Sequence, residues 1–154
     1  MKMKMKFSAI LVSSILLLIL ISGCATIGIS REEEVQGAIR LIDAGDADAL
    51  KASSRLPFLL DGEVILGESE LNLLWEGLSA AGFSFHNPVI DEVFPAEPEH
   101  YTLFGDSMDV EVYFKKYLQA KDAIVLFHAE EGAFVLILSS RKTGSKIAAL
   151  GGGV

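Results

Sequence analysis

The sequence predicts an α+β domain in which N-terminal helices pack on a curved antiparallel sheet. Two observations lead to this fold class. Between residues 31 and 82, apolar residues recur at the spacing of amphipathic helices and follow capping residues. Between residues 123 and 150, three apolar runs of strand length alternate with turn residues, as in an antiparallel meander. Helices followed by such a meander form two packed layers, with the sheet wrapping the helices.

Three helices are expected in the first half of this domain. The first begins at Ser30, which forms a capping box with Glu33, and it ends at Gly45. Asp46 can cap a short second helix, because its carboxylate accepts hydrogen bonds from free amides of the first turn. The third covers residues 69–82, where Ser69 is the expected N-cap and leucines and a tryptophan form one apolar stripe.

A β-hairpin is expected between the second and third helices. Strands at 56–60 and 63–66 flank Asp61-Gly62, which is a favoured two-residue turn. Residues 83–90 are read as a strand that is broken near a proline. Two further prolines then predict a loop up to about residue 100.

The segment 108–118 fits two periodicities. Its first apolar residues alternate as in a strand, whereas a longer window shows a helical stripe. We favour a helix, because Ser107 is a plausible N-cap. The meander strands are expected at 123–127, 133–138 and 146–150. Residues 151–154 are expected as a frayed tail.

This order of elements resembles the NTF2-like superfamily, which some classifications call cystatin-like. The residues that carry the resemblance are the N-terminal helix pair, the strand start Leu56-Pro57-Phe58, the turn Asp61-Gly62 and the meander end Lys146-Ile147-Ala148. It covers residues 31–150 and implies a cone with a pocket between the helices and the sheet. The alternative is a cystatin-type sheet with one main helix, and three helical patterns count against it. Members of the superfamily include isomerases, cyclases, transport factors and binding modules, so the fold does not select a function.

The N-terminus reads as an export signal. Lys2, Lys4 and Lys6 form a positive start, and residues 7–21 are apolar apart from three serines. This run is shorter than the roughly 20 residues that a membrane-spanning helix needs. Its length is typical of the apolar part of a signal peptide. An uncleaved membrane helix is the alternative.

The run Ile21-Ser22-Gly23-Cys24 resembles the lipobox of bacterial lipoproteins. This resemblance implies that residues 1–23 are a signal peptide and that Cys24 receives a diacylglyceryl group. Cleavage after Gly23 would free the amine of Cys24 for a further acyl chain such as palmitate. Ala25 is similar to the pattern of proteins sorted to the outer membrane, facing the periplasm. In a bacterium with a single membrane, the protein would sit on the outer face of the plasma membrane.

Lipidation and charge together limit the possible functions. Cys24 is the only cysteine, so its lipidation leaves the domain without a disulfide or a thiol-based metal site. Residues 24–30 form a tether that reaches at most about 20 Å when fully extended. The formal charge of −8 becomes −11 when Lys2, Lys4 and Lys6 are removed with the signal peptide. Such a domain is expected to repel nucleic acid, and no cofactor-binding motif is present.

Candidate catalytic residues follow from the chemistry of isomerases in this superfamily. That chemistry needs a carboxylate base and a proton donor in a dry pocket. The carboxylates are Asp61 and Asp91, and the donors are Tyr101, Tyr113 and Tyr117. Each also has a structural interpretation, because the aspartates fall at a turn and at a strand end, and the tyrosines suit core positions. We therefore assign no catalytic pair.

Candidate pocket residues are Trp75, His86 and His100. Trp75 lies on the apolar stripe of the third helix, where the alternative is a core residue. His86 follows Phe83-Ser84-Phe85 and is a candidate to line a pocket, with a loop histidine as the alternative. His100 follows a proline-rich loop and is a candidate for a pocket mouth. The three histidines, with His128, have no metal-binding spacing, so no metal is expected.

The leading expectation is a non-catalytic, lipid-anchored envelope protein that binds a small hydrophobic ligand or a protein partner. One alternative is a small pocket enzyme of the ketosteroid isomerase or polyketide cyclase type. Another is a structural module that forms a homodimer through its sheet. These alternatives predict, respectively, a carboxylate within hydrogen-bond reach of a pocket and an exposed apolar sheet face.

Overall fold

The structure is a computed structural model that describes residues 31–142 and 144–153. Contacts divide the chain into two units, Met1–Gln36 and Gly37–Val154. The described part of the first unit, residues 31–36, is helical. The predicted signal peptide, the lipobox with Cys24, and the tether lie outside the described residues. Within the described ranges, no helix is long and apolar enough to cross a membrane.

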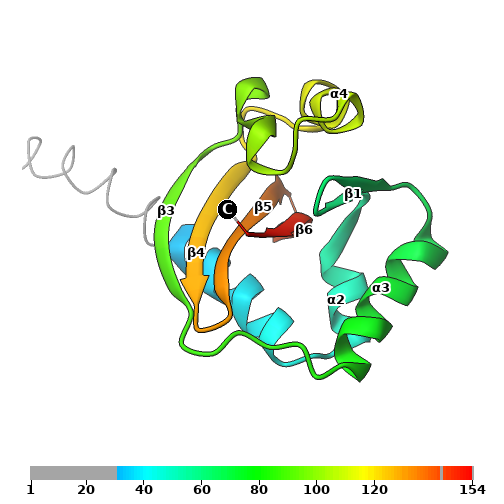
Figure 1. The fold of residues 1–154 in the computed structure, drawn as a ribbon, viewed down its shortest axis with the longest axis vertical. Helices are drawn as coiled ribbons and strands as arrows, with labels where there is room; N and C mark the ends of the chain where they lie inside the picture. The colour runs from blue at the N-terminus through cyan, green and yellow to red at the C-terminus, as the bar shows by residue number, and fades with distance from the viewer. Residues whose placement is uncertain (1–30, 143, 154) are drawn as a thin grey trace, which may run out of the picture. The chain divides into compact units, whose positions relative to one another are not determined.

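The second unit contains a curved, mixed sheet of six strands (Figure 1). The strands are β1 (Ser54–Leu60), β2 (Glu63–Ile65), β3 (Val89–Pro95), β4 (Ala123–Ala129), β5 (Gly132–Arg141) and β6 (Gly144–Gly152). Their order across the sheet is β2-β1-β6-β5-β4-β3. The α+β class is therefore confirmed, as are the hairpin and the terminal meander.

One strand pair corrects the expectation of an entirely antiparallel sheet. β1 runs parallel to β6, with Leu59 opposite Ala149 and Leu60 opposite Leu150. A parallel pair needs a long crossover connection, and here the whole segment between the two strands supplies it. The sequence pattern of each strand predicts its burial but not the direction of its neighbour, so this pairing was not predictable from periodicity.

The helices of the second unit begin with residues 37–43, which are helical. They continue with α2 (Ala47–Ser53), α3 (Glu68–Ala80), a 3-10 helix η1 (Pro98–Leu103) and α4 (Met108–Tyr117). Two predicted caps are confirmed. Asp46 Oδ1 accepts from Ala49 N at 3.0 Å at the start of α2. Ser107 Oγ accepts from Val110 N at 3.3 Å, so the helical interpretation of residues 108–118 is also confirmed.

Three expected boundaries were wrong. α3 starts at Glu68, and its N-cap is Gly67, two residues before the expected cap Ser69. Acidic side chains in the first turn interact favourably with the positive end of the helix dipole. The strand expected at 83–90 begins only at Val89 and includes Pro95, which an edge strand tolerates. The last strand continues to Gly152, beyond the start of the expected frayed tail, because its backbone pairs with β5 there.

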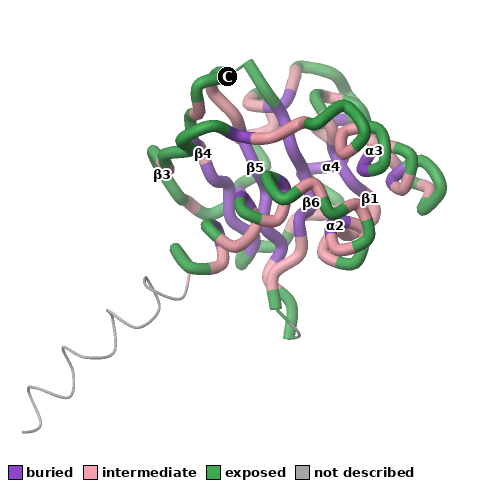
Figure 2. The backbone as a smooth tube through the Cα atoms, turned by 90° about the horizontal axis from the view of Figure 1, so that it is seen from below, coloured by how far each residue is buried: buried purple, intermediate pink, exposed green. Residues whose placement is uncertain are grey.

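Apolar side chains cover both faces of the central strands, which are buried along most of their length (Figure 2). One core cluster lies between the sheet and α4 with η1. Gly151 is needed in this core, because a Cβ there would lie 3.1 Å from Val135 Cγ1 and 3.2 Å from Phe104 Cδ1. Elsewhere in the core, Phe58 and Trp75 pack edge to face with centroids 5.6 Å apart. Aromatic pairs of this kind add stability beyond their buried area.

Candidate functional site

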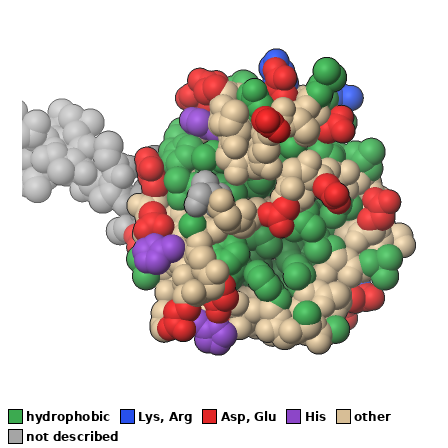
Figure 3. Space-filling view, in the orientation of Figure 1, with side chains coloured by type: hydrophobic (Ala, Val, Ile, Leu, Met, Phe, Trp, Pro, Cys, Tyr) green, Lys and Arg blue, Asp and Glu red, His purple; other side chains and the backbone are tan. Residues whose placement is uncertain are grey.

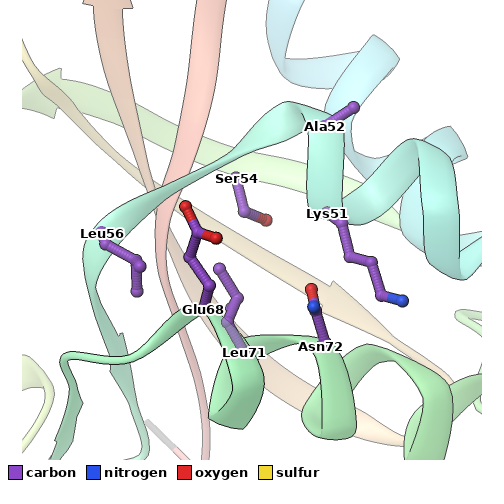
Figure 4. A pocket seen from close by; sticks show the side chains of 7 residues that line it. All are labelled: Lys51, Ala52, Ser54, Leu56, Glu68, Leu71 and Asn72. Carbon is purple, nitrogen blue, oxygen red and sulfur yellow. The ribbon is translucent and has the colours of Figure 1, made fainter.

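A pocket of about 320 Å³ opens between α2, β1 and α3 (Figure 4). We call it the α2–β1–α3 pocket. It is lined by Lys51, Ala52, Ser54, Leu56, Glu68, Leu71 and Asn72. Its volume is at the lower end of the range for sites that bind small molecules. The lining combines aliphatic side chains with groups that can accept or donate hydrogen bonds.

Hydrogen bonds of Ser54 hold the three elements around the pocket together. Ser54 Oγ donates to the carbonyl of Leu50 at 2.8 Å and accepts from Trp75 Nε1 at 3.0 Å. The first bond closes the end of α2, and the second joins β1 to α3. Trp75 is fully buried, so this predicted pocket residue supports the α2–β1–α3 pocket from the core and does not line it. The Ser54 hydroxyl uses its donor within the protein.

The charge of Lys51 is largely satisfied by neighbouring acids. Lys51 Nζ donates to Glu76 Oε1 at 2.7 Å and lies 3.6 Å from Asp48 Oδ1. The hydrogen bond to Glu76 is the main cause that raises the pKa of Lys51. In Figure 4 the ammonium group points to the side of the pocket, away from Leu56. Lys51 therefore contributes its aliphatic stem more than a free positive charge.

Two acceptor groups on α3 remain available to a ligand. Glu68 and Asn72 are four residues apart, so their side chains share one helix face. In Figure 4 both side chains rise from α3, that of Glu68 toward β1 and that of Asn72 toward Lys51 on α2. Among the residues that the structure describes, neither side chain has a hydrogen-bond partner or an ion pair. A carboxylate and an amide oxygen therefore face a pocket whose remaining surface includes Leu56 and Leu71.

The wider surface is also acidic. On the face shown in Figure 3, acidic side chains are spread around the domain, and basic side chains lie near the upper edge. The whole chain has 21 acidic and 13 basic residues. A surface with this excess raises the local concentration of cations and of ligands with a positive end.

The two predicted carboxylates are bonded elsewhere. Asp61 lies in the β1–β2 turn with a positive φ of 44° and accepts from the amide of Gly152 at 2.7 Å. It lines a smaller pocket of about 230 Å³ near the end of β6. Asp91 is exposed in β3, where its Oδ1 lies 2.8 Å from His128 Nδ1. Each aspartate therefore has a partner that explains its position.

The predicted tyrosines are part of the core. Tyr113 is fully buried, and its hydroxyl donates to the carbonyl of Ala148 at 2.8 Å, with the carbonyl of Pro57 at 3.2 Å. Burial raises the pKa of Tyr113 to about 12. Tyr101 is half-buried in η1 and packs against the same core cluster. The described contacts do not bring Tyr113 together with either predicted aspartate.

The two predicted pocket histidines have different surroundings. His86 pairs with Glu131 through its ring, and Glu131 Oε2 also accepts from the backbone amide of His86 at 3.0 Å. The side-chain hydrogen bond raises the pKa of His86 and lowers that of Glu131. His100 lines a second pocket of about 390 Å³ beside β3, where its Nδ1 accepts from the amide of Glu97 at 3.2 Å.

The described residues contain no cluster of three His, Cys, Asp or Glu side chains that could hold a metal ion. Comparison with known proteins found no matching family model and no matching curated protein.

Sequence reasoning missed the polar residues of the α2–β1–α3 pocket. Glu68 lies just outside the helix predicted at residues 69–82, and Asn72 lies within it, but neither was assigned a role. Two polar residues spaced beside Leu71 and Trp75 could have indicated a polar edge next to the apolar stripe. This spacing does not show which segment of the chain faces that edge of the helix. Ser54 was missed because its role depends on the indole of Trp75, which is distant in the sequence.

Proposed function

We propose that this chain is a lipid-anchored, non-catalytic protein of the bacterial cell envelope that binds a small, largely apolar ligand. The ligand site is the α2–β1–α3 pocket. The lipobox-like run ending at Cys24 supports the anchor. The helices, the β1–β2 hairpin and the terminal meander support an NTF2-like domain. The parallel pairing of β1 with β6 joins the hairpin and the meander in a single sheet.

The available acceptors of the pocket carry the argument for a ligand. Glu68 and Asn72 face the pocket without protein partners among the described residues, beside Leu56 and Leu71. A ligand that fits has an apolar body and an end that donates hydrogen bonds, such as an amine or a hydroxyl. A positive end fits best, because the carboxylate of Glu68 has no ion-pair partner in residues 31–142 and 144–153, and Lys51 is already paired with Glu76.

The isomerase alternative has less support. Asp61 and Asp91 are bonded to a backbone amide and to a histidine, and Tyr113 is bonded to main-chain carbonyls. A general base must reach the proton that it removes, so the alternative requires these groups to exchange their partners.

Native mass spectrometry of the protein purified from its own membrane tests the ligand proposal. We expect a bound small molecule in the wild type, and its mass gives its class. Glu68→Gln removes the charge in the pocket, whereas Glu70→Gln removes the charge of another exposed glutamate of the same helix that does not line the pocket. Loss of one charged hydrogen bond costs about 1.5–3 kcal/mol, or roughly 10- to 100-fold in affinity.

Equal ligand retention by Glu68→Gln and Glu70→Gln, together with unchanged retention by Asn72→Ala, would contradict the pocket. A ligand-free wild type would contradict the binding function itself. If a neutral ligand is retained equally by Glu68→Gln and the wild type but is lost from Asn72→Ala, the site stands and the preference for a positive end is wrong.

Metabolic labelling with palmitate tests the anchor. The wild type should incorporate the label, and Cys24→Ser should not, because the acylated sulfur is absent. Labelling that persists in Cys24→Ser would contradict the lipoprotein proposal. Separation of membranes from a double-membraned host then tests whether Ala25 directs the protein to the outer membrane.

A further inference from the structure

A buried polar cluster lies where the end of α4 meets the sheet. It consists of Arg55 on β1, Asp122 just before β4, and Ser139 on β5. The side chains of Arg55 and Asp122 are 10 % and 0 % exposed, and Ser139 is 1 % exposed as a residue. Charged and polar side chains at such depth need hydrogen-bond partners, because burial removes their water.

The strand register places Ser139 beside Asp122. Ala123 is opposite Leu138 in the antiparallel β4–β5 pair. One step earlier in β4 and one step later in β5, the next pair is Asp122 with Ser139. A hydrogen bond of 3.2 Å from Ser140 Oγ to the carbonyl of Lys121 shows that the strands remain adjacent one step further. Opposite residues in such a pair have Cβ atoms about 4.5–5.5 Å apart.

Two hydrogen bonds from the cluster hold the end of α4 and the segment that follows it. Arg55 Nη2 donates to the carbonyl of Tyr117, the last residue of α4, at 3.1 Å. Asp122 Oδ2 accepts from the amide of Gln119 at 3.0 Å and lies 3.7 Å from Arg55 Nη2. Three buried atoms then have no protein partner within the described ranges: Arg55 Nε, Asp122 Oδ1 and Ser139 Oγ.

We propose that one internal water molecule binds between these three atoms. Arg55 Nε is only a donor and Asp122 Oδ1 is only an acceptor, so a shared partner must both accept and donate. Ser139 Oγ can do either. Internal waters make about three hydrogen bonds to buried polar groups that would otherwise be unsatisfied, which is the number available here. The charges of Arg55 and Asp122 already balance, so the occupant is neutral.

This water would be part of the joint between α4 and the sheet. Both hydrogen bonds that the cluster makes to the backbone end on the last residue of α4 or on the connection to β4. The water links the two charged side chains that make these bonds to Ser139 of the central strand β5. The cluster thereby fixes the end of α4 against three strands of the sheet.

A crystal structure of the full chain in detergent, at a resolution that shows ordered water, tests the proposal. We expect one water peak within 2.7–3.2 Å of all three atoms. A direct hydrogen bond from Ser139 Oγ to Asp122 Oδ1 without a water peak would overturn it. A peak with the coordination of a metal ion would also overturn it. Cross-peaks between water and the Nε proton of Arg55 in NMR spectra provide the same test in solution, because that proton is the donor to the proposed water.

Two variants of Ser139 sharpen the test. Ser139→Ala removes one partner and should keep the water peak, since Arg55 and Asp122 remain. Ser139→Val fills more space and should displace the water, with loss of the cross-peaks. Ser140→Ala is the matched control, and it should leave the peak unchanged. Retention of the same peak in Ser139→Val would show that Ser139 does not line the water site, and it would overturn the proposed three-atom site.

Discussion

Asp122 is the buried acid whose replacement should destabilise the domain most clearly. In Asp122→Ala, Gln119 N loses its acceptor and Arg55 loses the only acidic partner that the described contacts give it. In the wild type the Arg55 side chain is 10 % exposed, and the hydrogen bond that the described contacts leave it in the variant is the one to the carbonyl of Tyr117. The variant therefore leaves a positive charge that is poorly solvated and without a counter-charge.

The geometry of the ion pair indicates that Asp122→Ala loses an amount of unfolding free energy at the lower end of the range for buried ion pairs. Removing one partner of a buried ion pair costs about 3–5 kcal/mol. The two side chains are 3.7 Å apart, which is long for a charged hydrogen bond, and Arg55 retains one bond. We therefore expect a loss of about 3 kcal/mol in the free energy of unfolding.

Urea unfolding followed by Trp75 fluorescence measures this loss. With a slope of about 2 kcal/mol per molar urea, the midpoint should fall by about 1.5 M. Asp48→Ala is the control, because Asp48 is 95 % exposed and should change stability little. The double variant Arg55→Met, Asp122→Ala should recover part of the loss. Equal midpoints for Asp122→Ala and Asp48→Ala, or strict additivity in the double variant, would refute the reasoning.

Three further outcomes follow from single positions. Gly151→Ala should cost about 1–3 kcal/mol in thermal unfolding by overpacking two core side chains, whereas Gly77→Ala, with open space in a helix, should stabilise by about 0.4–1 kcal/mol. The pairing of His86 with Glu131 should stabilise the fold most between pH 4.5 and 6.5, because it weakens above the raised pKa of His86 and below the lowered pKa of Glu131. In an NMR titration, the pKa of His86 should no longer be raised in Glu131→Gln. Tyr113 has a folded pKa of about 12 against 10.0, so stability should fall from pH 10 to 12 in alkaline unfolding, and less in Tyr113→Phe.

Much of the fold was predictable because its signals are local. Asp46 and Ser107 cap helices through bonds to residues three positions away, and the sequence shows both partners. The Asp61-Gly62 turn also depends only on local backbone preferences. The parallel neighbour of β1 was not predictable, because strand direction is decided by contacts between segments far apart in the chain.

The candidate site was less predictable for the same reason. Glu68 and Asn72 matter because β1 crosses above α3, and helix periodicity alone does not show which segment does so. Arg55 and Asp122 are 67 positions apart in numbering and meet only in the folded sheet. Trp75 was a candidate pocket residue with a core position as its alternative, and the fold buries its side chain completely.

The place of β6 has a consequence for how the domain is made. β6 is the last strand in the sequence, yet it lies inside the sheet between β1 and β5. Until residues 147–150 are available, the hairpin of β1 and β2 has no partner strand on its open edge, and the pocket wall that β1 provides has no fixed position. Such non-local pairing slows folding. During synthesis, the N-terminal segment therefore emerges long before the sheet can close, so the export and the acylation of Cys24 that we propose would act on a chain that is still unfolded.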